Sequence, residues 1–225
     1  MISPHKLVNY FKALLVYRNQ ISDILEVNTT KVNKLYQELY SSDFLRELRS
    51  QTGKSGSVLD SGMLNPMRAP ALYVICRLVK PDVVVETGVA NGFSSSFILN
   101  ALEINGRGDL YSIDLPNQPG QEIEEEVGWL IPDNLKHRWH LTIGSSQQEL
   151  PLLLQNLKKV DIFFHDSDHS YDHMMMEFTA VWKYLQPGSY LLADDITDND
   201  AFRDFAEEKN TAWCTFFKTG VARIP

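Results

Sequence analysis

From residue 83 onward the chain alternates short apolar runs with longer amphipathic stretches, and this alternation limits the folds open to it. The apolar runs are predicted strands over residues 83–86, 110–114, 139–144, 160–165 and 189–195. The stretches between and after them are predicted helices over residues 92–105, 148–157, 173–185 and 202–210. Strands that are apolar throughout and separated by helices are typical of a parallel sheet covered on both faces. The sequence therefore predicts an α/β fold.

The two ends of the chain complete this prediction. Residues 213–219 and 221–224 are predicted strands separated by little more than Gly220, which favours an antiparallel hairpin at the sheet edge. Apolar side chains at helical spacing predict helices in the first 50 residues, and a Gly- and Ser-rich segment follows over residues 51–62. We expect an N-terminal helical region over residues 1–55, acting as a cap or a dimer contact. Residues 56–225 are expected to form a Rossmann-like, doubly wound domain with a mostly parallel, seven-stranded sheet.

Charge and composition disfavour several classes of protein. The 225 residues carry a formal net charge of -8, spread along the chain, which disfavours binding to nucleic acid or to an acidic membrane surface. The N-terminus contains only a short apolar run, so neither a signal peptide nor a membrane span is expected. The two cysteines, Cys76 and Cys214, lie in apolar segments and are interpreted as buried thiols. We expect a cytoplasmic protein, with a homo-oligomer left open.

The segment E-T-G-V-A-N-G-F-S, residues 86–94 and here called the glycine turn, follows the first predicted strand. Two glycines four positions apart, Gly88 and Gly92, allow the backbone to turn tightly and to approach a ligand closely. The spacing differs from the G-x-G-x-x-G pattern of dinucleotide sites, which disfavours a nicotinamide oxidoreductase. Asp114 ends the second strand, where an acid can accept both hydroxyls of a ribose; a helix cap or turn former is the alternative.

The segment H-D-S-D-H-S-Y-D-H, residues 165–173, follows the fourth predicted strand and has three interpretations. The first is a hydrated loop in which Ser170 or Asp172 caps the next helix. The second is a zinc site made by His169 and His173, although the H-E-x-x-H pattern of metalloproteases has glutamate where Ser170 stands. The third joins this loop to the acids that end the next strand.

Asp166 on one strand end and Asp194 and Asp195 on the next are predicted to meet, since adjacent parallel strands lie about 5 Å apart. Three carboxylates in one place repel each other and raise their own pKa values unless a cation lies among them. Oxygen ligands of this kind suit Mg²⁺ or Ca²⁺. Such an ion lowers the pKa of a bound hydroxyl, and a neighbouring base then removes the proton.

The glycine turn, the I-D after the second strand and the G-S-S-Q after the third together resemble the class I S-adenosylmethionine-dependent methyltransferases. The chain is most similar, over roughly residues 62–200, to catechol O-methyltransferase-like enzymes and macrocin-type sugar O-methyltransferases. The resemblance implies S-adenosyl-L-methionine as the methyl donor. It also implies a donor site made of Glu86, Gly88, Gly92, Ser94, Asp114, Ser146, Gln147 and Asp166.

The same resemblance implies roles for the acidic strand ends. Asp166, Asp194 and Asp195 match ligands of Mg²⁺ or another divalent cation, and His169 matches the proton acceptor three positions after the first acid. That position holds lysine in the catechol type and histidine in the macrocin type, which favours a sugar hydroxyl. We expect an O-methyltransferase for a small hydroxylated acceptor. A metal-independent methyltransferase with another acceptor and a non-catalytic binding protein on the same fold are the alternatives.

Overall fold

The computed structural model describes residues 16–52, 68–115 and 127–225. Most of the Gly- and Ser-rich segment 51–62, where the sequence places the domain boundary, lies outside these ranges. In none of the described helices is there a stretch long and apolar enough to cross a membrane.

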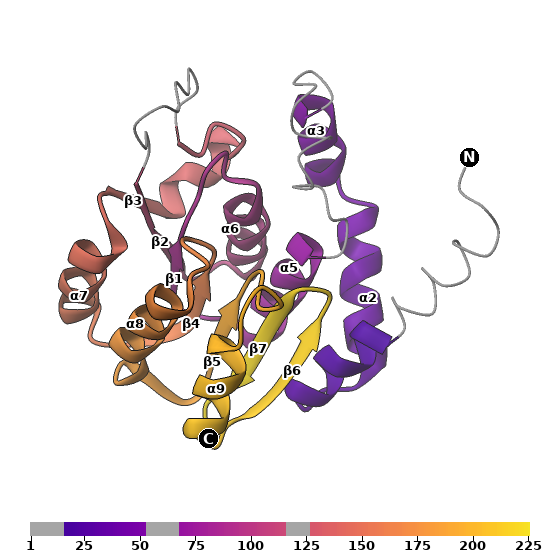
Figure 1. The fold of residues 1–225 in the computed structure, drawn as a ribbon. Helices are drawn as coiled ribbons and strands as arrows, with labels where there is room; N and C mark the ends of the chain where they lie inside the picture. Colours follow the sequence, from indigo (N-terminus) through magenta and orange to yellow (C-terminus); the bar gives the residue numbers. More distant parts are fainter. Residues whose placement is uncertain (1–15, 53–67, 116–126) are drawn as a thin grey trace.

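A single seven-stranded sheet forms the centre of the molecule (Figure 1). The strands are β1 (Val83–Thr87), β2 (Asp109–Asp114), β3 (Trp139–Ile143), β4 (Val160–His165), β5 (Leu185–Ala193), β6 (Ala212–Phe216) and β7 (Thr219–Arg223). Their order is β3-β2-β1-β4-β5-β7-β6; β1 to β5 are parallel, and β7 is antiparallel to both β5 and β6. The Rossmann-like sheet with its antiparallel hairpin is confirmed.

Helices cover both faces of the sheet, as the apolar strands require. The helical elements are α2 (Thr29–Tyr40), α3 (Asp43–Thr52), α5 (Arg68–Val79), α6 (Phe93–Asn105), η1 (Asp133–Arg138), α7 (Ser146–Leu157), α8 (Tyr171–Trp182) and α9 (Ala201–Glu208). One hydrophobic core joins α2, α3, α5 and α6 to one face, and a second joins α7, α8 and α9 to the other. Neighbouring strand residues alternate between them: Val84 lies in the first core and Val85 in the second.

The N-terminal helices pack as part of the first core. Val32 and Leu39 of α2 and Leu48 of α3 are almost completely buried in it together with residues of α5 and α6. Figure 1 shows α2 beside α5, on the side of the sheet away from α7 and α8. A role of this region as an acceptor cap or dimer contact stays a prediction.

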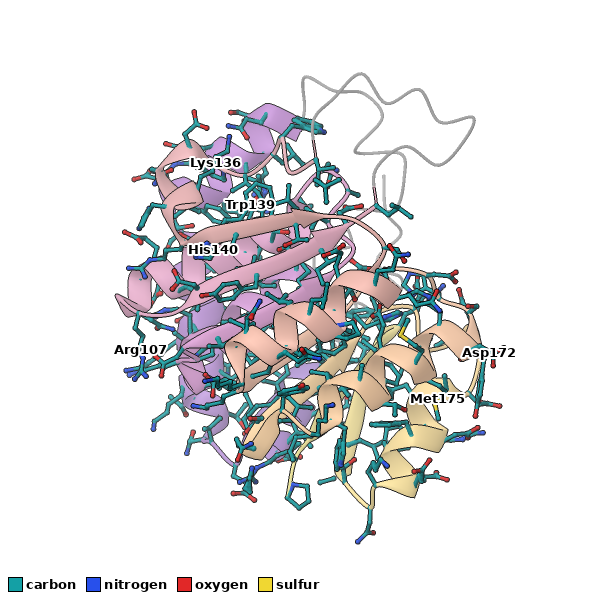
Figure 2. All side chains as sticks on the ribbon, turned by 90° about the vertical axis from the view of Figure 1, so that its left-hand side faces the viewer. Arg107, Lys136, Trp139, His140, Asp172 and Met175 are labelled. Atoms are coloured by element: carbon teal, nitrogen blue, oxygen red, sulfur yellow. The ribbon has the colours of Figure 1, made fainter. Side chains whose placement is uncertain are left out.

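Strand β3 forms one edge of the sheet, opposite the edge formed by β6 (Figure 2). Its Trp139 donates a hydrogen bond from Nε1 to Ser112 Oγ of β2 at 3.0 Å, and the His140 ring stacks on Tyr111 with ring centroids 4.6 Å apart. These contacts fix the register of β3 against β2 and so place the loop after β3 next to the loop after β2.

The connections leave the centre of the sheet in opposite directions. From β1 the chain moves outward through β2 to β3, and from β4 it moves to the other side through β5. In sheets of this kind, ligands bind outside the carboxyl ends of the strands at the point where the order reverses. The carboxyl ends of β1 and β4 mark that point here, and the glycine turn and Asp166 follow them.

Candidate functional site

The two glycines of the glycine turn combine a positive φ angle with neighbours that leave no room for a side chain. Gly88 has φ +85°, and a Cβ there would lie 1.9 Å from the carbonyl oxygen of Asp166. Gly92 has φ +83°, and a Cβ there would lie 2.7 Å from Ile131 Cγ1 and 2.8 Å from Gly128 Cα. Since backbone or buried side-chain atoms occupy each space, both positions require glycine. The turn is thereby held against the loop after β4 on one side and residues 128–131 on the other.

Glu86 ties the turn to the helix that follows it. Its fully buried carboxylate accepts hydrogen bonds from Ser94 Oγ at 2.7 Å, Ser95 Oγ at 2.6 Å and Ser112 Oγ at 2.9 Å. Burial raises the pKa of Glu86 to about 7, although the three serine hydroxyls oppose this shift. Glu86 therefore fixes the first turn of α6 from beneath.

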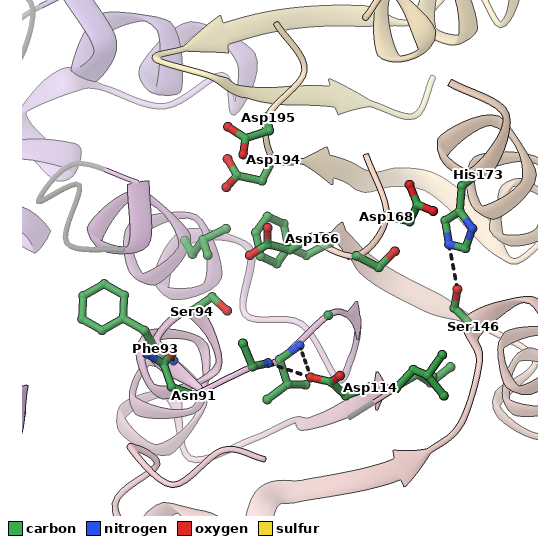
Figure 3. A pocket seen from close by; sticks show the side chains of 18 of the residues that line it. Asn91, Phe93, Ser94, Asp114, Ser146, Asp166, Asp168, His173, Asp194 and Asp195 are labelled. Atoms are coloured by element: carbon green, nitrogen blue, oxygen red, sulfur yellow. Dashed lines mark hydrogen bonds between the residues drawn. The ribbon is translucent and has the colours of Figure 1, made fainter. Parts of the chain in front are cut away.

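Asp114, at the end of β2, binds the backbone of the glycine turn. Its Oδ2 accepts hydrogen bonds from the backbone nitrogens of Val89 at 2.8 Å and Ala90 at 2.6 Å (Figure 3). Ala90 has φ +49°, a left-handed conformation that a non-glycine residue rarely adopts. These two charge-assisted bonds hold it there.

A cavity of about 790 Å³ opens along this edge of the sheet. Eight of the eleven predicted site residues line it: Gly88, Ser94, Asp114, Ser146, Gln147, Asp166, Asp194 and Asp195. Glu86, Gly92 and His169 are not part of the lining: Glu86 and Gly92 support the turn, and His169 lies beside Asp166 and Asp195. The lining also contains residues outside this predicted set, among them Arg68, Asn91, Phe93, Asp168, His173 and Thr219.

Three of the lining residues, Asp166, Asp194 and Asp195, are here called the aspartate trio. The register of β4 and β5 pairs His165 with Ala193, and Asp194 donates its backbone N–H to the His165 carbonyl at 2.9 Å. This pairing places the three acids side by side at the carboxyl ends of the two strands (Figure 3). Asp195 has φ +48°, so the backbone is strained where the second and third acids follow one another.

Arg68, the first residue of α5, neutralises part of this charge. Its Nη2 lies 2.6 Å from Asp195 Oδ1 and also contacts Asp194 Oδ1. Thr219 donates to Asp194 Oδ1 at 3.0 Å, and Lys218 Nζ lies 3.3 Å from Asp195 Oδ1. No local pattern marks Arg68 as a site residue, because it precedes Asp195 by 127 positions and is brought to it only by the packing of α5.

The chemistry of the aspartate trio suits a hard divalent cation. Burial raises the pKa of Asp166 well above its ordinary value, and the neighbouring Asp194 adds to the shift; burial also raises the pKa of Asp194. A divalent ion would reverse both shifts. Among the described residues, no three Asp, Glu, His or Cys side chains converge closely enough, as they stand, to surround an ion. The guanidinium of Arg68 lies between two of the acids instead, so the magnesium site stays a prediction.

His169 lies beside the trio. Its Nε2 is 3.8 Å from Asp166 Oδ1 and 3.9 Å from Asp195 Oδ2, and 27% of its side chain is exposed. Asn199 Nδ2 donates to the His169 carbonyl at 2.6 Å, which anchors the loop. Burial lowers the pKa of His169, and the nearby His165 lowers it further, so the neutral imidazole is the favoured form near pH 7.

Two further histidines, His165 and His173, both contact the buried carboxylate of Glu177. His165 Nδ1 lies 2.7 Å from Glu177 Oε2, and His173 Nε2 lies 2.9 Å from Glu177 Oε1. His173 Nε2 also lies 2.9 Å from Ser146 Oγ at the start of α7. Burial opposes ionisation of Glu177, but the bonds from His165 and His173 outweigh it, and the pKa of Glu177 lies well below its ordinary value. Glu177 itself was not predicted as a site residue.

Solved structures share this fold. An O-methyltransferase from Bacillus cereus in complex with SAH has a TM-score of 0.60 and 15% identity, covering 81% of this chain and 91% of that one. TomG, an O-methyltransferase from Streptomyces achromogenes solved with SAM, has a TM-score of 0.55 and 20% identity, covering 70% and 79%. CalS11, a TDP-rhamnose 3′-O-methyltransferase of calicheamicin biosynthesis, has a TM-score of 0.58 and 17% identity, covering 87% and 93%.

The fold, the glycine turn and Asp114 at the end of β2 define a class I S-adenosylmethionine-dependent methyltransferase, as the sequence predicted. Residues 85–196 match the family model Methyltransf_24, a methyltransferase domain, and the chain belongs to this group of enzymes. No curated protein matches the sequence significantly. The prediction of an enzyme is confirmed, against the alternative of a non-catalytic binding protein.

Proposed function

We propose that this methyltransferase transfers the methyl group of S-adenosylmethionine to a hydroxyl oxygen of a small acceptor, such as a sugar or a hydroxylated natural product. The observation that carries the proposal is the aspartate trio with His169 beside it, at the wall of the cavity that the glycine turn and Asp114 also line. CalS11, one of the structural neighbours, is a sugar O-methyltransferase, which supports an acceptor of this class.

The donor would lie along the carboxyl ends of β1, β2 and β4. Asp114 would offer Oδ1 to the ribose hydroxyls, since its hydrogen bonds from the backbone of Val89 and Ala90 fall on Oδ2. Ser146 and Gln147 would border the adenine, and Gly88 and Ser94 would border the methionine moiety. Glu86 and Gly92 would act from behind, by fixing the turn on which these residues lie.

The reaction requires that the acceptor hydroxyl lose its proton as its oxygen attacks the methyl carbon. The new O–CH₃ bond forms as the S–CH₃ bond breaks, and the sulfonium becomes a neutral thioether. We propose that Nε2 of His169 takes the hydroxyl proton, so that the positive charge passes from sulfur to an imidazolium beside Asp166 and Asp195. Two carboxylates within 4 Å of that nitrogen would stabilise the charge.

A divalent cation, Mg²⁺ by preference, would be held by Asp166, Asp194 and Asp195. Bound there, it would lower the pKa of the acceptor hydroxyl and fix the position of its oxygen. For these acids to serve as ligands, Arg68 must withdraw from Asp194 and Asp195. The contacts of Arg68 with Asp194 and Asp195 support an alternative arrangement, in which its guanidinium stays in place and the enzyme needs no metal.

Donor binding is tested first by calorimetry with S-adenosylmethionine, S-adenosylhomocysteine and, as a negative control, NAD. We expect binding of the first two and none of the third. Acceptors are then screened by mass spectrometry for the gain of one methyl group, using nucleotide sugars, glycosides and catechols with and without Mg²⁺. Methylation at nitrogen rather than oxygen, or a failure to bind the donor at sub-millimolar concentration, would refute the proposal.

A further inference from the structure

A fully buried carboxylate below the cavity collects hydrogen bonds from four side chains. Glu177 accepts from Thr87 Oγ1 at 2.6 Å, His165 Nδ1 at 2.7 Å, Ser167 Oγ at 2.9 Å and His173 Nε2 at 2.9 Å. These donors come from the end of β1, the end of β4, the loop after β4 and α8. An ionised carboxylate offers about four acceptor positions, so the capacity of Glu177 is filled and its orientation is fixed.

The bond between Glu177 and His165 determines where the proton of His165 lies. An ionised carboxylate only accepts hydrogen bonds, so Nδ1 of His165 must carry the proton and Nε2 must carry a lone pair. That Nε2 is buried and has no hydrogen-bond partner within the described residues. Since buried polar atoms nearly always have a hydrogen-bond partner, we expect Nε2 of His165 to accept a hydrogen bond from a nearby donor.

A second unpaired ring nitrogen belongs to the neighbouring histidine. Nδ1 of His169 is also buried without a partner in the described part of the chain. The rings of His165 and His169 pack edge to face, with centroids 5.4 Å apart and planes at 85°. No hydrogen bond joins the two nitrogens in the structure, and one N–H shared between them would satisfy both. Because His165 Nε2 carries no proton, His169 Nδ1 must supply it.

We propose that Glu177 and His165 hold His169 as its Nδ1–H tautomer and thereby keep the lone pair of Nε2 directed at the aspartate trio. The inference rests on the proposed function, in which His169 Nε2 receives the acceptor proton. The opposite tautomer would set two lone pairs against each other at the buried contact. Glu177 and His165 lie behind the cavity wall, so they are positioning residues that act through His169.

Two substitutions of His165 by amide residues distinguish control of the His169 tautomer from a role of His165 in packing alone. Asparagine places its amide nitrogen near the position of Nδ1, so H165N keeps a donor for Glu177 and removes Nε2. Glutamine reaches the position of Nε2, so H165Q offers His169 a carbonyl oxygen that accepts its proton. We expect H165N to lower kcat about 10²-fold with little change in the KM for S-adenosylmethionine, and H165Q to keep most of the activity.

The tautomer is read directly from the ¹⁵N chemical shifts of the His169 ring in the ligand-free protein. We expect a protonated Nδ1 and an unprotonated Nε2 in the wild type and in H165Q, and a shift toward protonated Nε2 in H165N. Thr87→Val is the matched control, because it removes a different bond to the same Glu177 oxygen and should leave the tautomer unchanged.

Wild-type protein with the proton on His169 Nε2, or an unchanged tautomer in H165N, would overturn the proposal. If H165N does not fold, Glu177→Gln replaces it, since the glutamine amide can donate to His165 Nδ1 and so reverse both tautomers. A protein that shows the expected tautomers but binds no methyl donor would refute the proposed function while leaving the positioning pair intact.

Discussion

Nη2 of Arg68 lies 2.6 Å from Oδ1 of Asp195, across 127 positions of sequence, and the same nitrogen contacts Asp194. One guanidinium therefore bridges two of the three carboxylates that the proposed function assigns to a cation. Burial opposes ionisation of Asp195, but the hydrogen bonds and charges of Arg68 and Lys218 together outweigh it and lower the pKa of Asp195, whereas burial keeps the pKa of Asp194 raised. Although Arg68 contacts both acids, the pKa of Asp195 is lowered and that of Asp194 stays raised.

Removal of Arg68 is expected to tighten the binding of a divalent cation. In Arg68→Ala, the acids lose a competing positive charge, and we expect Mn²⁺ to bind the S-adenosylhomocysteine complex about tenfold more tightly, as measured by calorimetry. A tenfold change corresponds to about 1.4 kcal/mol. The control is Arg107→Ala, which removes an ion pair with Asp82 away from the cavity. Weaker Mn²⁺ binding in the Arg68 variant than in the wild type would contradict a competitive role.

A methyl group at Gly88 is expected to destroy the donor site. Gly88 and Gly188 both have φ +85°, but a Cβ at Gly88 would lie 1.9 Å from the Asp166 carbonyl oxygen, whereas at Gly188 it would meet nothing within 4 Å. Gly188→Ala should cost only the left-handed backbone strain, about 1–2 kcal/mol of unfolding free energy. Gly88→Ala should cost more and abolish binding of S-adenosylhomocysteine. Equal effects in thermal unfolding and calorimetry would show that the close approach is unimportant.

Glu86 is expected to make the stability of the protein fall as pH rises from about 4.5 to 7. Its pKa is raised from the ordinary 4.5 to about 7 in the folded state, chiefly by burial. Below pH 4.5 both states hold the proton; between 4.5 and 7 the unfolded chain releases it first, so the folded state loses stability. Above pH 7 the full penalty, about 3 kcal/mol, is present.

Urea unfolding of wild type and Glu86→Gln across this pH range measures the effect. Relative to the glutamine variant, wild type should lose about 3 kcal/mol between pH 4.5 and 8. Glu103→Gln provides a control of opposite sign, since the hydrogen bond from Arg138 lowers the pKa of Glu103. A stability difference between wild type and Glu86→Gln that stays constant with pH would disprove the shift.

Asp114 is expected to raise the affinity for the methyl donor in two ways, by holding the backbone of the glycine turn and by binding the ribose hydroxyls. Asp114→Asn keeps the shape but loses the charge that accepts the Val89 and Ala90 backbone bonds. We expect S-adenosylhomocysteine to bind roughly 10- to 100-fold more weakly, since a bond to a charged group contributes about 1.5–3 kcal/mol. Asp109→Asn, at the opposite end of β2, is the matched control and should bind normally. Equal affinities in both variants would remove Asp114 from the site.

The architecture was predictable because its signals are local. Apolar runs and turn residues located the five parallel strands, and the predicted strand over residues 160–165 has the bounds of β4. The strand predicted over residues 189–195 begins earlier in the structure, at Leu185, because β5 includes a polar segment ahead of its buried core. It ends at Ala193, which leaves Asp194 and Asp195 in the loop where they can face the cavity.

The site was only partly predictable because some of its contacts depend on packing. Residues that follow strands, such as Asp114 and Asp166, could be found from the sequence, since parallel strands bring their carboxyl ends to one edge. Arg68 and Glu177 lie on helices, and no motif distinguishes them from other charged residues. Their importance appears only when α5 and α8 pack on opposite faces of the sheet, which brings Arg68 to the loop after β5 and the buried Glu177 to the loop after β4.

The rate of methyl transfer to the best acceptor of the screen, measured after chelation with EDTA and again after addition of Mg²⁺, tests the central claim most directly. We predict that chelation abolishes transfer, that Mg²⁺ restores it in the wild type, and that it does not restore it in Asp195→Ala. Undiminished transfer in EDTA would contradict the metal site and leave Arg68 as the cation of the aspartate trio.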